Sequence, residues 1–525
     1  MPCSLWAYRV HPSSVVRNSV VDWTAGGEVI SIKTTWILGD QLSRSNAALE
    51  GCTPSDTRIL MIEATSALTG KRFHRQRLHL VMAGMRKLAA ALEEEGFEVD
   101  YRRASTFRSG VQAHRREHRP STIRVMAPTS WDMREHLASM EVQLVPTNQF
   151  LCSAEDFAQW AHGRNRVVME DFYRWQRRRL GYLMDGDQPA GGKWNFDASN
   201  REPPDETDDD WPEPARFALD STDRTVVDGL PDGAFGSPPD GTWGTTRAQA
   251  LERLAEFIEF RLPRFGPQQD AMLSDHWSMR HSLISPYLNL GLLHPGEVCD
   301  AVEHAYRTGH VPIESAEGFI RQVIGWREYV WGVYWMWMPE YRGLNALDAA
   351  LPLPPAFTTG RTRMRCVEAT LHAVAEHGYA HHIQRLMIIA NLGLIAGIRP
   401  SELTSWMRNS FVDGGDWVMQ PNVIGMGLYA DGGMMSTKPY AAGGNYISKM
   451  SDYCTSCPYE PKKRTGPDAC PFTTLYWDFL DRNGTALAGN HRMARQLAGA
   501  RRLSNMPEVR DRAREVLSLL DEGEL

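Results

Sequence analysis

Short apolar stretches alternate with longer amphipathic ones in the first third of the chain. The short stretches have the length of buried strands and fall at 34–38, 58–62, 97–101, 123–126 and 142–145. The longest amphipathic stretch, 74–95, spaces its apolar residues as a helix does. Strands that alternate with helices predict a parallel α/β sheet, here over 34–150. Ligands of such sheets bind at the carboxyl ends of strands, where Gly39, Asp40 and Gln41 follow the first predicted strand.

The pattern changes twice more along the chain. Residues 151–245 are mixed and contain an acidic, Pro-rich stretch at 202–214, which predicts an interdomain linker with an exposed loop. Residues 246–525 are dominated by helical spacing and hold few strand signals, so we expect an all-α domain there. Residues 1–33 have no clear periodicity and predict a flexible N-terminal extension. The fold class that follows is α/β + all-α.

The composition excludes several broad classes of protein. A chain of 525 residues with 42% hydrophobic and 23% charged residues is globular, and its length predicts about two to four domains. Lys and Arg number 57 against 64 Asp and Glu, and the formal net charge of −7 disfavours an overall basic nucleic-acid binder but leaves a local basic face open. No apolar run reaches the ~18 residues that a membrane helix needs, and no signal-peptide pattern is present. We therefore expect a soluble, cytoplasmic protein. A monomer is a separate expectation.

Three of the eight cysteines cluster near the C-terminus. Cys454 and Cys457 form a CxxC, and Cys470 follows shortly after. Two thiolates at i and i+3 can reach one metal centre, Cys470 can supply a third ligand, and Cys366 is the natural fourth. On spacing alone, zinc, an iron–sulfur cluster and a group of buried reduced thiols all remain open. A redox dithiol is disfavoured because no βαβ pattern surrounds the CxxC.

Two further segments carry candidate chemistry. Residues 281–285 offer hydroxyl and backbone N–H groups at a helix start, which suits a diphosphate, although ordinary helix capping is the alternative. Residues 317–329 form an aromatic helix in which Trp326 can stack on a nucleic-acid base with Arg327 nearby. The alternative for this helix is a core position with solvated arginines.

Two adjacent histidines open another strongly helical segment. His381 and His382 lie ~100° apart on a helix, so they cannot chelate one metal ion together. One of them can face a cavity as a proton donor with a pKa near neutrality. A single such histidine is usually structural, but the presence of Arg385 in the same apolar segment favours a functional site.

These segments are similar to the motifs of a known family. The chain resembles the iron–sulfur bacterial cryptochromes and photolyases, also called prokaryotic (6-4) photolyases, over about residues 34–520. The motifs that carry the resemblance are LGDQLS at 38–43, GGKWNFDASNR at 191–201, QDAML at 269–273, HSLIS at 281–285, GFIRQVIGWREY at 318–329, YAHHIQRLM at 379–387, PNVIGM at 421–426, ADGG at 430–433, and SDYCTSCPY with ACPF around the clustered cysteines. They imply an N-terminal Rossmann-like antenna domain and a C-terminal helical domain that binds FAD.

The resemblance implies three cofactor sites. The family ligands of a [4Fe–4S] cluster correspond to Cys366, Cys454, Cys457 and Cys470. FAD is expected beside the charged pair Arg385 and Asp413, and the other flavin-pocket residues correspond to His281, Ser282, Leu283, Ile284, Ser285, Gln322 and Asn422. A 6,7-dimethyl-8-ribityllumazine antenna is expected at Gly39, Asp40 and Gln41.

The same resemblance implies a light-driven repair enzyme. Excited reduced FAD donates an electron to a (6-4) pyrimidine photoproduct flipped out of UV-damaged DNA, and a histidine proton lets the hydroxyl return to its base. His382 and Tyr440 match the lesion-site residues, and His381 is the adjacent family histidine. Trp406 matches the electron donor next to the flavin. Two alternatives stay open: a cryptochrome-type blue-light photoreceptor with little repair, and an iron–sulfur nucleic-acid-binding protein without photochemistry.

The chain departs from the family at four positions. Met407 and Thr358 replace a tyrosine and a tryptophan that carry the hole away from Trp406, and this change predicts inefficient photoreduction. Met419 replaces a glutamate shortly before PNVIGM. Ala67 replaces an acidic residue of the antenna pocket, which predicts a weaker or altered antenna site.

Overall fold

The computed structural model describes residues 32–204 and 210–525. The extension predicted over 1–33 therefore lies almost entirely outside the described residues. Residues Ile32–Leu525 form one compact unit. The domain boundaries at 150 and 245 stay predictions.

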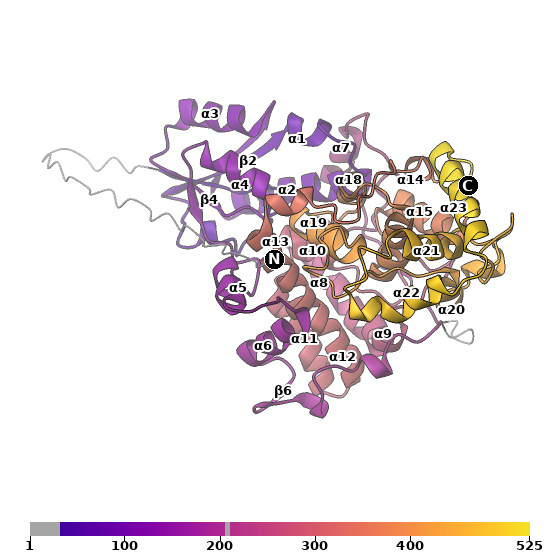
Figure 1. Ribbon diagram of the computed structural model, residues 1–525. Helices are drawn as coiled ribbons and strands as arrows, with labels where there is room; N and C mark the ends of the chain where they lie inside the picture. Colours follow the sequence, from indigo (N-terminus) through magenta and orange to yellow (C-terminus); the bar gives the residue numbers. More distant parts are fainter. Residues whose placement is uncertain (1–31, 205–209) are drawn as a thin grey trace, which may run out of the picture. The chain divides into compact units, whose positions relative to one another are not determined.

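A parallel sheet organises residues 33–145, as the alternating pattern predicted (Figure 1). Its strands are β1 Lys33–Trp36, β2 Thr57–Ala64, β3 Glu98–Ala104, β4 Ile123–Met126 and β5 Gln143–Val145. The helices that alternate with them are α1 Thr65–Thr69, α2 Arg75–Glu94, α3 Phe107–His118 and α4 Trp131–Ala138. The strand order is β3-β2-β1-β4-β5, and every neighbouring pair is parallel. The carboxyl end of β1, with Gly39 to Gln41 just beyond it, therefore lies in the middle of the sheet.

Helices dominate the remainder of the described chain, which confirms the all-α prediction for 246–525. The α-helices are α5 Ala154–Ala161, α6 Met169–Leu180, α7 Ser221–Asp228, α8 Arg247–Glu256, α9 Leu262–Gln268, α10 Ser285–Leu290, α11 Pro295–Arg307, α12 Ile313–Ile320, α13 Glu328–Trp337, α14 Ala356–Thr359, α15 Arg365–His377, α16 His382–Gln384, α17 Asn391–Ala396, α18 Pro400–Ser410, α19 Asp416–Gln420, α20 Gly444–Met450, α21 Pro471–Arg482, α22 Ala494–Arg501 and α23 Met506–Glu522. The short pairing strands are β6 Met184–Asp185 and β7 Gln188–Pro189. The 3₁₀ turns are η1 Ala47–Leu49, η2 Ala190–Gly192, η3 Asp197–Ser199, η6 Glu340–Gly343, η9 Tyr453–Thr455 and η10 His491–Met493.

Several helices contain π-helical segments, in which backbone hydrogen bonds join residues i and i+5. These segments are η4 Phe257–Arg261, η5 Arg321–Arg327, η7 Arg385–Ala390 and η8 Pro421–Gly427. Such segments are rare in proteins overall, but those that occur often lie at functional sites. The segments η5, η7 and η8 carry Gln322, Arg385 and Asn422, three residues predicted for the flavin pocket.

Residues in the segment 151–201 pack against the core of the helical region. Phe157 on α5 and Phe172 on α6 are fully buried in the same apolar core as α13 and α15. The Cβ atom of an alanine at position 332 would lie 2.1 Å from the Phe157 ring, so only glycine lets α13 approach α5 this closely. The acidic stretch 202–214 forms no helix or strand over its described residues.

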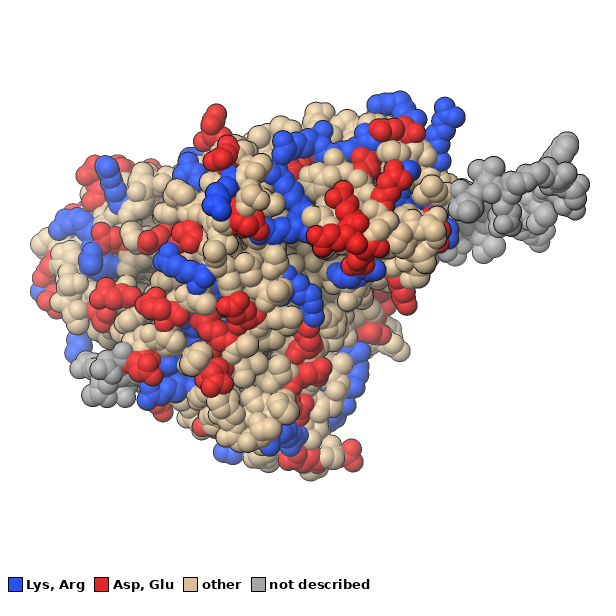
Figure 2. Space-filling view, turned by 180° about the vertical axis from the view of Figure 1, so that it is seen from behind, with Lys and Arg blue, Asp and Glu red and all other residues tan. Residues whose placement is uncertain are grey.

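Charged side chains of both signs are scattered among uncharged residues on one face of the molecule (Figure 2). On the face drawn in Figure 2, Lys and Arg side chains alternate with Asp and Glu over short distances. This mixture agrees with the small net charge of −7 on 525 residues. Among the described residues, no helix is both long and apolar enough to cross a membrane.

Candidate functional site

The four predicted ligand cysteines converge on one pocket. Cys366 lies at the start of α15, Cys454 lies in η9 with Cys457 shortly after, and Cys470 directly precedes α21. All four thiols line the same pocket, together with apolar and aromatic side chains such as Ile447. Burial raises the pKa of Cys366 and Cys470, and it raises that of Cys454 to about 11. Thiolates in such surroundings need a cation to balance their charge, so the donor set fits a metal centre with four sulfur ligands.

A glycine keeps this pocket open. A Cβ atom on Gly444 would lie 2.8 Å from the Cys470 sulfur. The Gly444 N–H donates to the Thr473 hydroxyl at 2.9 Å, which fixes the backbone at this approach. The pocket therefore has no room for a side chain at position 444.

The charged pair predicted for the flavin pocket is formed. Arg385 donates to both carboxylate oxygens of Asp413, at 2.9 and 3.1 Å. The Ser285 hydroxyl donates to Asp413 Oδ2 at 2.6 Å, so the structure brings the end of the HSLIS segment to this pair. The Arg385 guanidinium lies 4.1 Å from the centre of the Phe411 ring, so a cation–π contact adds to the ion pair.

The middle of the HSLIS segment offers polar groups only from its backbone and serines. The side chains of Leu283 and Ile284 are buried in the core. Leu283 has a left-handed backbone with φ of 57°, which turns the chain just before α10 begins at Ser285. Ser282 Oγ accepts a bond from the Ile284 N–H at 3.5 Å. Any contact of Leu283 or Ile284 with a bound phosphate would have to come from the main chain.

Three histidines form a ring cluster that sequence spacing did not reveal. The His281 and His381 rings stack at 4.3 Å with an angle of 11° between their planes, and His382 meets His281 edge-on at 5.2 Å. Burial lowers the pKa of His281 and His381 well below the ordinary range, so both are neutral near pH 7. Neither ring nitrogen of His381 has a protein hydrogen-bond partner, and His281 Nε2 has none either. These orphaned polar atoms fit a site that receives a polar ligand.

The histidine cluster is not a metal centre, although its nitrogen atoms lie within 4.8 Å of one another. A histidine lone pair points outward in the plane of its ring. The nearly parallel rings of His281 and His381 therefore cannot both direct a lone pair at one ion. His382, by contrast, has a side chain that is 48% exposed, and its Nε2 lies 3.3 Å from Asp270 Oδ1.

Tyr440 lies on the same charged surface as His382. The charges of Arg201 and Arg492 act on its hydroxyl, while partial burial raises its pKa. Arg201 is also 3.7 Å from Asp270, the partner of His382. Arg201 and Asp270 were not among the predicted site residues, although both lie within motifs that carried the family resemblance.

The aromatic helix corrects one prediction. Arg327 is buried, pairs with Glu328 at 2.6 Å, and lies 4.2 Å above the Phe150 ring. The prediction that Arg327 contacts DNA is therefore wrong, because its guanidinium faces the core. Trp326 is half-buried and donates its indole N–H to Asn422 Oδ1 at 2.9 Å. Gln322 donates to Gly318 O within its own helix at 3.3 Å.

Trp406 is connected to the charged pair through Phe411. Its ring meets Phe411 edge-on at 5.9 Å, and the Arg385 guanidinium stacks on the Phe411 ring. The Trp406 indole N–H donates to Phe357 O at 2.9 Å. Thr358, one of the predicted departures from the family, directly follows Phe357 in the chain.

The predicted antenna residues lie at the carboxyl end of β1. Asp40 accepts from the Thr129 hydroxyl at 2.5 Å, and burial raises the pKa of its carboxyl group. Gln41 donates to Met126 O at 2.9 Å, which ties β1 to the end of β4. A Cβ atom on Gly39 would lie 3.1 Å from side-chain atoms of α2. The strand end is thus tightly packed, and the Gln41 side chain joins β1 to β4.

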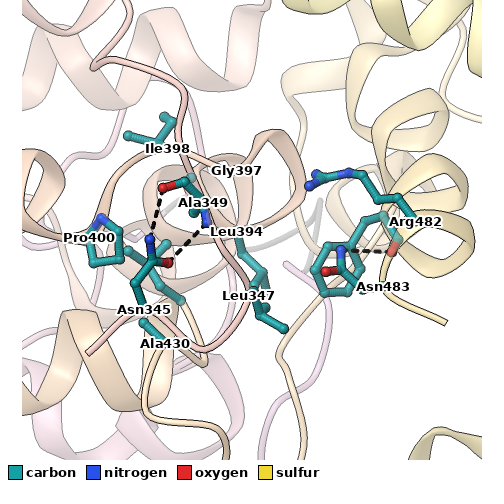
Figure 3. A pocket seen from close by; sticks show the side chains of 13 residues that line it. Asn345, Leu347, Ala349, Leu394, Gly397, Ile398, Pro400, Ala430, Arg482 and Asn483 are labelled. Atoms are coloured by element: carbon teal, nitrogen blue, oxygen red, sulfur yellow. Dashed lines mark hydrogen bonds between the residues drawn. The ribbon is translucent and has the colours of Figure 1, made fainter. Parts of the chain in front are cut away.

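A separate pocket lies among Asn345, Gly397 and Arg482 (Figure 3). Arg482 extends from α21 and donates to Ile395 O near the end of α17. Asn345 exchanges two hydrogen bonds of 3.0 Å with the backbone of Ala349. These polar groups are used within the protein, and no predicted site residue lines this pocket.

Comparisons with known proteins agree on one family. A family model described as deoxyribodipyrimidine photo-lyase-related protein matches residues 35–237. The (6-4) photolyase of Agrobacterium fabrum is 42% identical over 503 residues, which cover 92% of this chain and 99% of that protein. An uncharacterised mimivirus protein, R855, is 39% identical over 97 residues, 18% of this chain and 72% of its own.

A solved structure supports the same fold. A bacterial class III photolyase from Agrobacterium tumefaciens superposes with a TM-score of 0.56 at 16% identity, covering 94% of this chain and 99% of that one. The family resemblance seen in the motifs is confirmed by the 42% identity over nearly the whole length of the Agrobacterium fabrum protein. This chain therefore belongs to the family of bacterial (6-4) photolyases.

Proposed function

We propose that this protein is a light-dependent DNA repair lyase that reverts (6-4) photoproducts. The observation that carries the proposal is the 42% identity to a (6-4) photolyase over 92% of the chain, with the histidine cluster beside the Arg385–Asp413 pair. Excited, reduced FAD supplies the electron when it is bound. The chain's own residues bind the flavin, hold the lesion and provide the proton.

The flavin pocket is proposed around Arg385 and Asp413. Because both groups are largely buried and doubly hydrogen-bonded, they present a fixed dipole to a bound ring system. The Ser285 hydroxyl also donates to this carboxylate, to Oδ2 at 2.6 Å. Gln322 and Asn422 lie on neighbouring π-helical segments and complete the proposed pocket.

His382 is the proposed proton donor. His281 and His381 are buried, whereas the half-exposed His382 is the member of the cluster that a lesion at the surface can reach. Its Nε2 lies 3.3 Å from Asp270 Oδ1, so this carboxylate can orient the imidazole ring. Proton transfer from Nε2 to the lesion oxygen then assists the return of the hydroxyl group. Tyr440 is proposed to contact the lesion on the same surface.

The remaining cofactors and partners are also proposals. The cysteine pocket holds a [4Fe–4S] cluster, supported by the convergence of Cys366, Cys454, Cys457 and Cys470. A lumazine antenna binds at the β1 strand end. UV-damaged DNA binds over His382 and Tyr440, with Trp326 retained as a proposed base contact, and the protein acts as a monomer in the cytoplasm.

The test is repair of DNA that carries a single (6-4) photoproduct. The purified protein with reduced FAD should restore the two pyrimidines under blue light and not in the dark, as measured by chromatography of the digested product. A cyclobutane dimer in the same sequence should be a poorer substrate, since it requires no hydroxyl transfer. A protein that binds FAD but repairs neither lesion would instead be a photoreceptor.

A further inference from the structure

A buried hydrogen-bond path joins the cysteine pocket to the histidine cluster. Tyr453 directly precedes Cys454, lines the cysteine pocket and is 1% exposed. Its hydroxyl oxygen accepts a hydrogen bond from Gln384 Nε2 at 2.9 Å. The other end of the same amide, Gln384 Oε1, accepts from the backbone N–H of His381 at 3.2 Å. Because both side chains are buried, water does not compete for these bonds.

The pocket end of the path is held by two cysteine-bearing segments. Tyr453 belongs to η9, the turn that contains Cys454. Its hydroxyl also lies beside that of Thr370, one helical turn after Cys366. The Thr370 hydroxyl donates to Cys366 O at 2.8 Å. The position of the Tyr453 hydroxyl therefore depends on how η9 and α15 close around the pocket.

The other end of the path is the start of the helix that carries the site. Gln384 closes the short helix α16, which His382 opens, and Arg385 follows at once in η7. The Gln384 amide binds the first free N–H of this turn, so its position fixes the turn. A displacement of the turn shifts His382 and Arg385 together. A reacting group displaced by ~1 Å loses about 10²-fold in rate.

We propose that Tyr453 is a positioning residue, whose hydroxyl couples the closed cysteine pocket to the Gln384 cap and thereby sets the positions of His381 and His382. The part of this inference that concerns repair rests on the proposed function. The coupling itself rests on the hydrogen bonds alone. It gives the cysteine pocket a role in the repair site that requires no electron transfer through a cluster.

The experiment compares Tyr453→Phe with the parent as purified flavoprotein with its metal bound. The matched control is Tyr341→Phe, which also removes one buried hydroxyl, in this case one that donates to Asp431 at 2.8 Å outside the path. Three quantities are measured: iron and FAD per chain, hydrogen exchange of the His381 amide, and the pH profile of (6-4) repair.

Tyr453→Phe should keep the parental iron and FAD content while the His381 amide exchanges at least about tenfold faster. Its repair rate should fall about 10- to 100-fold, with an altered pH profile, because the proton donor is displaced. Tyr341→Phe should match the parent in all three measurements. Gln384→Met removes the amide in the middle of the path, so this variant should reproduce the faster exchange and the altered pH profile.

Parental exchange and an unchanged pH profile in both Tyr453→Phe and Gln384→Met would overturn the coupling. Loss of iron from Tyr453→Phe would also overturn it, since the hydroxyl would then hold the pocket itself. If Tyr453→Phe does not fold, the same measurements on Gln384→Met decide. If the parent repairs no (6-4) DNA, the exchange measurement still tests the coupling, and the failure belongs to the proposed function.

Discussion

At the residue scale, burial assigns different roles to chemically identical side chains. His281 and His381 stack in the interior and stay neutral, while His382 reaches the surface beside Asp270. The sequence identified His381 and His382 as a pair but gave no sign of their contact with His281, about 100 residues earlier. Such a contact depends on tertiary packing, which spacing along the chain does not encode.

Arg327 also shows that sequence spacing does not reveal tertiary packing, because a side chain predicted to face DNA is buried. Polar and apolar residues are mixed in η5, and α13, which follows it, is apolar on nearly every side, so the sequence does not indicate which face around Arg327 is buried. The guanidinium faces Phe150 and Glu328 and makes no surface contact. The family motifs predicted Arg385 and Asp413 as a charged pair before any packing was known, and the two side chains are paired, while their place beside a flavin stays a proposal.

Replacing Asp413 by Asn should destabilise the protein. The substitution leaves Arg385 largely buried without its counter-charge, and breaking such a pair costs about 3–5 kcal/mol. The free energy of unfolding in denaturant should fall by this order, and the absorbance of bound flavin per chain should fall with it. Unchanged unfolding together with full flavin content would contradict the role of the pair.

Trp406 should control reduction of the flavin by light. Its ring contacts Phe411, and its indole N–H donates to Phe357 O. Met407, next in the chain, and Thr358, next after Phe357, are poor carriers of a hole. Trp406→Phe should abolish most photoreduction under blue light with a thiol reductant, followed as bleaching of flavin absorbance. Met407→Tyr combined with Thr358→Trp should accelerate it. Fast photoreduction that survives Trp406→Phe would show that the electron enters by another route.

At the element scale, the ends and irregular turns of helices position the chemistry. The π-helical segments η5, η7 and η8 each carry a residue proposed for the flavin pocket. The apolar spacing around η5 and η7 is close to that of ordinary helices, so the sequence predicted helix at these two segments and could not predict the extra residue per turn. The short strands of the sheet were predicted within a few residues because buried strands and their connecting helices differ clearly in length.

Gly444→Ala should disturb the cysteine pocket at the start of α20. The added methyl group would lie 2.8 Å from the Cys470 sulfur, closer than nonbonded atoms allow. Iron bound per chain, measured by elemental analysis, should fall sharply. Gly489→Ala is the matched control, because nothing lies within 4 Å of its added methyl group. Equal iron in both variants, or zinc in the parent, would contradict the proposed centre.

At the scale of the whole molecule, contacts distant in sequence tie the sheet region to the helices. His74 accepts from the Gln76 N–H at the start of α2, and its Nε2 lies 3.0 Å from Ala375 O on α15. The division into an α/β part and a helical part followed from the change of periodicity alone. The contact between His74 and Ala375, which are 301 residues apart, could not be predicted in this way. No local sequence pattern indicates which loop packs against which helix.

The burial of His74 at this contact predicts a pH dependence of stability. Burial lowers the pKa of His74 to about 4, so between this value and ~6.5 the unfolded chain binds a proton that the folded chain does not. The free energy of unfolding should therefore be unaffected by His74 above pH 6.5 and fall by about 3 kcal/mol as the pH drops to 4. Denaturant unfolding of His74→Gln should show a correspondingly flatter decline than the parent. Parallel declines would show that His74 is protonated in the folded state.

The most direct test of the account is the rate of light-driven (6-4) repair in His382→Ala. The parent should restore the pyrimidines, and the variant should lose about 10²–10⁴-fold of this rate while it keeps its FAD and iron, because only the proton donor is removed. His372→Ala, which removes an exposed histidine on α15, should repair at the parental rate. Repair by His382→Ala as fast as by the parent would contradict the assignment of the site.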